Sequence, residues 1–194
     1  MQIKLRKPKN HLDWLRLYGL YRSAFPAAER KPFGIIAKMY RRGRSDVWCL
    51  EAEGRFAGLA TTVNGGELVL LDYFAVKKRQ RGKGIGSAAM ARMQRIYADK
   101  GFFVEIESTW EDAPNLAQRQ KRKRFYEAAG MEAMEVQADV FGVKMELLGS
   151  RCRLDFDRYR AFYHDHYSPW AAQHITQWDE KSDPTEVGSP EISD

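Results

Sequence analysis

The segment from Leu68 to Gly86 constrains this chain more than any other part of it. Its first half is almost continuously apolar or aromatic, which is typical of a strand covered on both faces. Three glycines then stand at alternate positions, Gly82, Gly84 and Gly86, and apolar residues recur at helical spacing from Ile85 onward. The segment therefore predicts a buried strand, a glycine-rich loop and a helix in direct succession.

This succession suits an anionic ligand. Glycines let the backbone curl without Cβ clashes. Unpaired amide N–H groups can then converge at the helix N-terminus, where the helix dipole also favours negative charge. The basic side chains that precede the third glycine are Lys77, Lys78, Arg79, Arg81 and Lys83. The pattern predicts a cradle for a pyrophosphate group.

Two other nucleotide-binding motifs compete with this interpretation. A Walker A loop requires G-x-x-x-x-G-K-[ST], and the sequence lacks that string. A Rossmann fingerprint does match residues 84–89, and Glu105 and Glu107 follow about 20 residues later, where a ribose-binding acid belongs. Rossmann glycines, however, follow their strand almost directly, whereas a basic stretch separates Val76 from Gly84. We therefore favour a pyrophosphate loop of another kind.

Composition limits the remaining choices. The 194 residues suffice for one ordinary domain, and 44% hydrophobic with 30% charged residues is a globular composition. The longest uncharged stretch, 166–178, is shorter than the roughly 20 apolar residues that a membrane span needs. No apolar run follows the basic N-terminus, so we expect no secretory signal and a cytoplasmic location. Two cysteines cannot form a disulfide framework or a four-cysteine metal site.

Charge is distributed unevenly along the chain. The net charge is +6, but residues 179–194 hold six acids and one lysine, a net of −5, so the rest carries 6 + 5 = +11. A body this basic indicates either an anionic partner or a solubilising surface. The acidic tail has few apolar residues and is predicted to be disordered.

Apolar spacing predicts twelve elements in the order β-α-α-β-β-β-α-β-α-β-β-α. Glu53-Gly54 reads as a hairpin turn between two strands. A basic helix over 115–129 ends before Gly130, and one C-terminal helix is predicted from Asp155 to about Trp178.

Several motifs together resemble the GNAT superfamily of N-acetyltransferases. The family's coenzyme A motif is [Q/R]-x-x-G-x-[G/A], and both 79–84 and 81–86 fit it. Residues 124–131, Arg-Phe-Tyr-Glu-Ala-Ala-Gly-Met, look like the family's F-Y-E-x-x-G-F/M segment, and 141–148 resemble its last strand. The resemblance covers about residues 3–148.

The resemblance implies an α/β (α+β) fold with a mixed, mostly antiparallel, twisted sheet of six to seven strands flanked by helices. Residues 1–150 would form the acetyltransferase domain, 151–178 an added helix packed on it, and 179–194 the tail. It also implies transfer of an acetyl group from acetyl-CoA to a primary amine of a small molecule or peptide, by direct attack in a ternary complex. The alternative is a non-catalytic module of the same fold that senses acyl-CoA or contacts RNA. A homodimer is left open.

The family's cofactor contacts can be carried over to matching positions. Backbone groups of Phe74 and Val76 would bind the pantetheine arm like an added strand. The full expected set is Phe74, Ala75, Val76, Arg79, Arg81, Gly82, Lys83, Gly84, Ile85, Gly86, Ser87 and Asn115. Asn115 is the departure, because Arg119 stands where the family often places its Asn. No metal is expected, since His164-Asp165-His166 is too isolated for ligation.

Catalysis requires a proton donor and a proton acceptor. Tyr126 matches the family's general acid, which protonates the departing thiolate of coenzyme A. The candidate bases are Asp72, Glu107 and Glu105, and we rank Asp72 and Glu107 above Glu105. Proton removal through a water relay is the alternative. Alternation places Glu105 and Glu107 on one face of their strand and predicts that Asp72 shares a face with Phe74 and Val76.

Acceptor recognition is expected from the loop after the first helix. The resemblance implies that this loop lines the acceptor cleft, so Phe25 and Glu29 are expected there, with Glu105 on the facing strand. Glu29 would hold a cationic amine. The basic run 119–124 fits either an RNA-contacting helix or a solvated face that partly serves coenzyme A phosphates, and we favour the solvated face.

Overall fold

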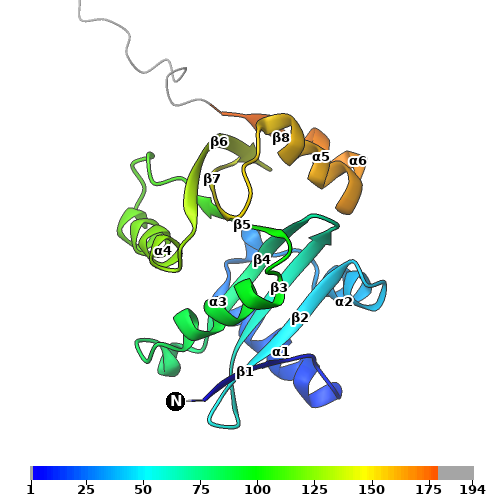
Figure 1. Cartoon of the computed structure of the whole chain (residues 1–194), viewed down its shortest axis with the longest axis vertical. Helices are drawn as coiled ribbons and strands as arrows, with labels where there is room; N and C mark the ends of the chain where they lie inside the picture. Colours follow the sequence, from blue (N-terminus) through cyan, green and yellow to red (C-terminus); the bar gives the residue numbers. More distant parts are fainter. Residues whose placement is uncertain (1, 179–194) are drawn as a thin grey trace, which may run out of the picture.

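The computed structural model describes residues 2–178, which form one eight-stranded sheet with helices on both faces (Figure 1). The strands are β1 (Ile3–Arg6), β2 (Ser45–Ala52), β3 (Arg55–Gly65), β4 (Leu68–Val76), β5 (Gly101–Glu107), β6 (Glu132–Val140), β7 (Val143–Ser150) and β8 (Ile175–Gln177). The helices are α1 (His11–Ala24), α2 (Phe33–Arg41), α3 (Ile85–Ile96), α4 (Leu116–Ala128), α5 (Phe156–His166) and α6 (Pro169–Gln173), with short 3₁₀ helices η1 (Ala27–Glu29) and η2 (Lys78–Gln80).

The sheet confirms the predicted fold class. Its strand order is β1-β2-β3-β4-β5-β7-β6-β8. Only β4 and β5 pair in parallel, and the other neighbours are antiparallel. It has one strand more than the predicted maximum of seven, because β8 pairs with β6.

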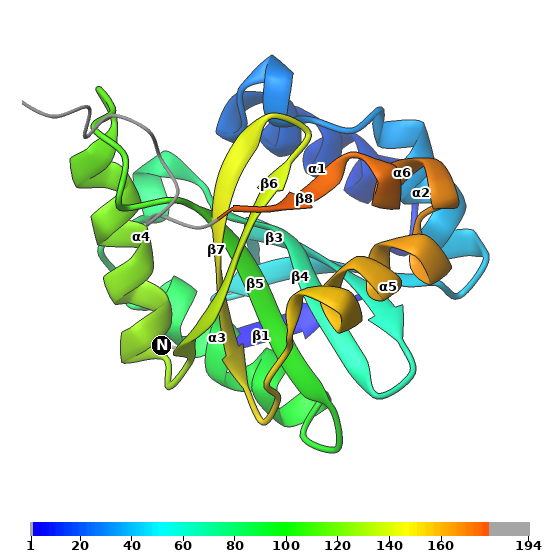
Figure 2. The same cartoon turned by 90° about the horizontal axis from the view of Figure 1, so that it is seen from above.

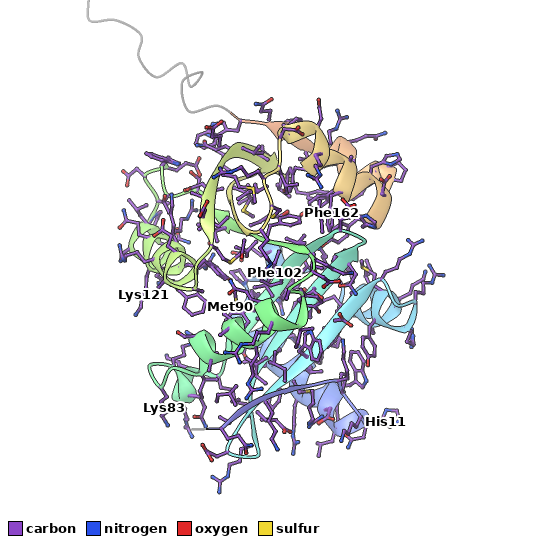
Figure 3. The ribbon with its side chains drawn as sticks, in the orientation of Figure 1. His11, Lys83, Met90, Phe102, Lys121 and Phe162 are labelled. Atoms are coloured by element: carbon purple, nitrogen blue, oxygen red, sulfur yellow. The ribbon has the colours of Figure 1, made fainter. Side chains whose placement is uncertain are left out.

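Three apolar clusters join the sheet to its helices. The helices α3 and α4 cover one face, where Met90 and Phe102 are fully buried (Figure 3). On the other face, α1 and α2 cover β2 to β4, while α5 and α6 cover β4 to β7 (Figure 2). Within residues 2–178, no helix is both long and apolar enough to cross a bilayer.

The C-terminal segment differs from the single helix predicted over 155–178. Helix α5 stops at His166, α6 is a separate short helix that starts at Pro169, and β8 follows. Proline suits the first turn of a helix but cannot continue one, and the Ser168 side chain caps α6 by accepting from the amide of Ala171. The division at residues 150 and 178 stays a prediction, and the predicted disordered tail lies outside the described residues.

The strands β4 and β5 separate after four paired positions. Their register ends at Leu71↔Val104, although both strands continue beyond it. A register shift in the β3–β4 pair leaves Asp72 as an extra residue between Leu71 and Tyr73, which is a β-bulge. Bulges bend a strand and increase its twist. We refer below to the point where the two strands part as the fork.

The bulge overturns one expectation about side-chain direction. Phe74 and Val76 pack with the cluster under α3 and α4. Asp72 instead forms an ion pair with Lys31 and thus lies on the opposite face, as does Tyr73. Simple alternation fails here because the extra residue at the bulge shifts the pleat by one position.

A buried ion pair fixes β1 to α1 and gives a stability prediction. The Asp13 side chain is 3% exposed and accepts hydrogen bonds from Arg6 Nη1 at 2.6 Å and Nη2 at 2.8 Å. These bonds hold the pKa of Asp13 well below its ordinary range. We expect Arg6→Met to lower the free energy of unfolding at pH 7 by about 3 kcal/mol, because it leaves a buried carboxylate without its main partner.

Urea unfolding measures the free energy of unfolding of Arg6→Met, and Arg16→Met is the control variant. Arg16 also approaches Asp13, but at 3.9 Å with a side chain 45% exposed, so its loss should cost under about 1 kcal/mol. Because folding lowers the pKa of Asp13, its contribution is present near neutral pH and disappears as pH falls below about 4. The stability difference between wild type and Arg6→Met should therefore shrink in acid; equal losses in the two variants would contradict the prediction.

Candidate active site

The loop between β4 and α3 leaves open space in front of its backbone. Gly82 and Gly84 have φ of 75° and 73°, in the left-handed region that favours glycine. A Cβ at either position would meet no atom within 4 Å. The loop therefore offers the free volume that a phosphate group needs beside main-chain amides.

The N-terminus of α3 carries no side-chain cap, unlike those of α1, α5 and α6. Asn10, Asp155 and Ser168 each accept a hydrogen bond from an amide in the first turn of their helix. The cap of α3 is Gly84, which has no side chain to offer. Amides in the first turn of a helix have no partner within the helix, and the helix dipole makes them attractive to anions. The start of α3 thus fits a pyrophosphate, as the sequence predicts.

Basic side chains surround this helix start. Lys77, Lys78, Arg79, Arg81 and Lys83 are all exposed. Lys83 lies at the beginning of α3 with its side chain in solvent (Figure 3). Arg81 Nε donates to the carbonyl oxygen of Val76 at 3.0 Å, so the last carbonyl of β4 already has a partner. A pantetheine hydrogen bond to that oxygen would have to share it with Arg81.

Aromatic rings connect the loop to α4. Phe74 of β4 stacks on Phe125 of α4 with ring centroids 5.9 Å apart, and Phe125 contacts Tyr126 at 5.1 Å. A Cβ on Gly86 would lie 3.2 Å from the Phe125 ring. The third glycine therefore permits the close approach of α3 to α4.

Tyr126 lies buried between α4 and the sheet, in the cluster that contains Val104 and Ile106 of β5. Among residues 2–178, no side chain or backbone group forms a hydrogen bond with its hydroxyl. Burial raises the pKa of Tyr126 to about 12, with Arg122 opposing the shift. The phenol therefore keeps its proton at neutral pH and has it available for a reacting group.

Glu107, at the end of β5, is bound by three side chains: two from α4 and one from Asn115, the residue that caps the N-terminus of α4. Arg122 Nη1 donates to Oε2 at 2.6 Å, Asn115 Nδ2 donates to Oε1 at 3.1 Å, and Arg119 Nη2 lies 3.2 Å from Oε1. Burial acts to raise the pKa of Glu107, but the bonds from Arg122 and Asn115 outweigh it and the net pKa is lowered. A carboxylate so stabilised in its charged form is a weak proton acceptor.

Two tyrosines, Tyr73 of β4 and Tyr21 of α1, hold the loop between α1 and α2. Tyr73 Oη donates to the carbonyl of Glu29 at 2.9 Å and accepts from the amide of Lys31 at 3.1 Å. Tyr21 Oη donates to the carbonyl of Lys31 at 2.9 Å. Phe25 packs on Tyr73 with ring centroids 4.9 Å apart. We call residues 26–32 the acceptor loop, after the role that the sequence predicts for it.

The pKa of Glu29, on this loop, is shifted in the opposite direction to the pKa of Glu107. Partial desolvation and the nearby Glu107 carboxylate raise the pKa of Glu29, while Arg122 and Arg119 oppose the shift. The acceptor loop therefore lies close enough to the end of β5 for the charges there to act on Glu29. Glu29 therefore has a higher affinity for a proton than Glu107.

Comparisons with known proteins agree with this geometry. The model of the acetyltransferase (GNAT) family matches residues 14–131. The chain belongs to the acetyltransferase (GNAT) family. The matched region of this GNAT protein includes the glycine loop, the fork and Tyr126, and it makes the protein an acyltransferase by family.

Solved GNAT structures share the fold at low sequence identity. A putative GNAT acetyltransferase from Bacteroides thetaiotaomicron aligns with a TM-score of 0.70 and 16% identity, over 89% of this chain and 99% of that one. An aminoglycoside 6′-N-acetyltransferase complexed with coenzyme A aligns with a TM-score of 0.64 and 14% identity, over 80% and 100%. A spermidine N-acetyltransferase chimera from Vibrio cholerae and hSSAT aligns at 0.60 and 14%, over 77% and 95%. No curated protein sequence matches the chain.

The other two candidate bases of this GNAT protein, Asp72 and Glu105, accept hydrogen bonds from side chains outside the sheet. Asp72 Oδ1 accepts from Lys31 Nζ at 2.7 Å. Glu105 accepts from Tyr159 Oη at 2.7 Å and from Tyr163 Oη at 2.8 Å. Asn115, whose contact with the cofactor stays a prediction, donates to Glu107 and accepts from Arg119 Nε at 2.9 Å.

The basic helix α4 is less solvated than expected for a GNAT surface helix. Arg119 and Lys123 have side chains only 12% and 19% exposed, and they pair with Glu107 and Glu146. Gln120, Lys121, Arg122 and Arg124 of the same run are exposed, and Lys121 points outward in Figure 3. Two cations of the run 119–124, Arg119 and Lys123, therefore face the protein and neutralise buried acids. The expectation of a solvated face did not include these contacts.

Sequence reasoning missed Lys31 and the tyrosines of α5. Lys31 appears in the sequence as one cation among many, beside Pro32. The only available signal was Tyr159, Tyr163 and Tyr167 at a spacing of four, which reads equally well as an ordinary apolar helix face.

Proposed function

We propose that this protein transfers the acetyl group of acetyl-CoA to a primary amine by direct attack in a ternary complex. The observation that carries the proposal is Tyr126: a buried phenol, protonated at neutral pH and without a hydrogen-bond partner among residues 2–178, connected through Phe125 and Phe74 to an uncapped glycine-rich helix start. The Tyr126 hydroxyl is not among the fully enclosed, unpartnered polar atoms of residues 2–178, so it remains accessible to a reacting group, which a module that only binds would not require.

Acetyl-CoA, when bound, would supply a thioester whose acyl carbon is attacked by the amine nitrogen. The amides at the start of α3 and the basic loop would hold its pyrophosphate and 3′-phosphate. Phe74 and Val76, at the free edge of β4 beyond the fork, would align the pantetheine arm. Tyr126 would donate its proton to the sulfur as the C–S bond breaks, so that coenzyme A leaves as the thiol.

The amine must also lose a proton. Glu107 is a weak candidate because its pKa is lowered by Arg122 and Asn115 against the effect of burial, and Asp72 is paired with Lys31. Glu29 has a raised pKa and lies in the acceptor loop. We therefore assign Glu29 to hold the acceptor ammonium, with the proton leaving to Glu29 or to water beside it.

A panel of amines tests the proposed activity. The related structures include N-acetyltransferases for an aminoglycoside, spermidine and the ribosomal protein L7/L12. Purified protein should release free thiol from acetyl-CoA with at least one aminoglycoside, polyamine, amino acid or peptide amine. Binding of coenzyme A without acetylation of any amine would favour the non-catalytic alternative.

Glu29→Gln should raise the KM for the best acceptor about tenfold, because the amide carries no charge to pair with an ammonium group. The KM for acetyl-CoA should stay within about twofold. Since the pKa of Glu29 is raised, acceptor binding by the wild type should weaken as pH falls through that pKa, and Glu29→Gln should lose this pH dependence. Glu67→Gln, on a side chain 92% exposed, is the control. Unchanged acceptor KM in Glu29→Gln would remove Glu29 from acceptor binding.

A further inference from the structure

Two carboxylates occupy the fork itself. Leu71 and Val104 form the last residue pair that joins β4 to β5, and Asp72 and Glu105 are the residues that directly follow them. Both lie on the face that α5 covers. Burial raises the pKa of Glu105, while bonds from Tyr159 and Tyr163 act against it. The fork is thus a place where two acids need partners from outside the sheet.

Helix α5 supplies those partners from one row of side chains. Tyr159 and Tyr163 lie in α5, and Tyr167 caps its C-terminus with its amide bonded to the carbonyl of Tyr163, so their spacing of four residues places all three along one face. The rings of Tyr159 and Tyr163 lie 5.5 Å apart, and those of Tyr163 and Tyr167 lie 4.7 Å apart. The first two hydroxyls donate to Glu105. We call these three residues the tyrosine row.

The third tyrosine of the row reaches the acceptor loop. Lys31 Nζ donates to Tyr167 Oη at 2.8 Å and to Asp72 at 2.7 Å, and it lies 4.0 Å from the centroid of the Tyr167 ring. The backbone of Lys31 is bound on both sides, by Tyr73 at its amide and by Tyr21 at its carbonyl. Lys31 is therefore the residue through which α5, β4 and the acceptor loop meet.

A helix that only covered apolar surface would not need hydroxyl groups at these positions. Tyr159 is 0% exposed and Tyr163 is 3% exposed, and phenylalanine would bury the same area without a polar group to satisfy. All three hydroxyls instead converge on ionic side chains at the fork and the acceptor loop. Their arrangement fits a role in fixing geometry, since fully bonded buried networks restrict motion.

We propose that Tyr167, acting through Lys31, is a positioning residue that holds the acceptor loop in its binding geometry. The C-terminal segment would thereby set how well the acceptor amine is bound without contacting it. This inference rests on the proposed function for its kinetic consequence, but the structural consequence can be measured on its own.

The test uses Tyr167→Phe in the full chain, which keeps the ring and its contacts and removes only the hydroxyl. The acceptor KM should rise about fivefold, the effect of one lost hydrogen bond, while the KM for acetyl-CoA stays within about twofold. Amide hydrogen exchange over residues 26–32 should become faster, with protection in α5 retained. Tyr40→Phe is the matched control, since its ring packs on Trp14 and its hydroxyl has no hydrogen bond among the residues described.

A double-mutant cycle shows whether Tyr167 acts through Lys31. In a Lys31→Met background, Tyr167→Phe should change neither the acceptor KM nor the exchange of the loop any further. A full additional effect in that background would overturn the inference, as would wild-type loop exchange in Tyr167→Phe. If the wild type acetylates no amine, the proposed function fails, and the exchange measurements still decide the inference.

Discussion

Tyr126→Phe should lower kcat by about 10²–10⁴, the usual contribution of a general acid. The substitution keeps the ring and its packing against Phe125, and it removes a hydroxyl that has no hydrogen bond within residues 2–178. Folding and coenzyme A affinity should therefore change little, and the KM for acetyl-CoA should stay within a few-fold. Steady-state kinetics with the best acceptor measure the loss.

The pKa of Tyr126 gives the expected pH behaviour. Because burial raises this pKa to about 12, the wild-type phenol stays protonated across the usual assay range, and its ionisation should produce no fall in kcat below about pH 10. Full turnover in Tyr126→Phe would show that water or the acceptor supplies the proton to sulfur.

Tyr97→Phe is the matched control for a buried tyrosine. Tyr97 Oη donates to Asp46 at 2.7 Å and accepts from Trp48 Nε1 at 3.1 Å. Its loss should reduce stability, because it leaves buried polar groups without a partner, yet kcat should remain near the wild-type value. The two variants thus separate an effect on chemistry from an effect on folding.

Gly84→Leu should abolish the stabilisation of the protein by coenzyme A. Coenzyme A at 100 times its Kd should stabilise the wild type by about 2.7 kcal/mol, which raises Tm by about 5–10 °C for a chain of this size. The leucine side chain would occupy the open space in front of the loop, where the phosphate is expected. Differential scanning calorimetry with and without coenzyme A measures the shift.

Backbone strain has to be separated from this effect. Gly84 has φ of 73°, so any L-residue there costs about 1–2 kcal/mol. Gly54, in the β2–β3 turn, has the same φ of 73° and equally open space around its Cβ position, so Gly54→Leu carries the same strain away from the site. Both variants should melt lower than the wild type, but Gly54→Leu should keep the full coenzyme A shift. Retention of the shift in Gly84→Leu would contradict the assignment of the loop.

Local patterns predicted most of the elements, because each depends on neighbouring residues. The turn at Glu53-Gly54 has positive φ at both residues, as a two-residue hairpin turn of type I′ requires. The strand, loop and helix around Gly82, Gly84 and Gly86 appear where apolar spacing and glycines placed them. The prediction of one continuous C-terminal helix was wrong because Pro169 cannot continue the preceding helix and starts a new one.

Long-range features were the ones that the sequence did not reveal. The β8 strand is only three residues long, and it exists because β6 offers a free edge at Val140. The bulge at Asp72 depends on the register between β3 and β4, so alternation along β4 alone assigned Asp72 to the wrong face. Pairing partners far apart in the sequence decide both features.

The family resemblance, the expected phosphate-binding loop and the candidate acid could all be read from the sequence, because glycine conformation, helix starts and the Phe125-Tyr126 motif are local. The proton affinities of the carboxylates depend instead on contacts between segments that are distant in the sequence. Glu107, Glu105 and Glu29 look alike as letters, yet two arginines at Glu107, two tyrosines at Glu105 and partial desolvation at Glu29 give them different proton affinities. A carboxyl group's chemistry is set by its dielectric surroundings and its neighbouring charges, and these are fixed only when distant segments meet.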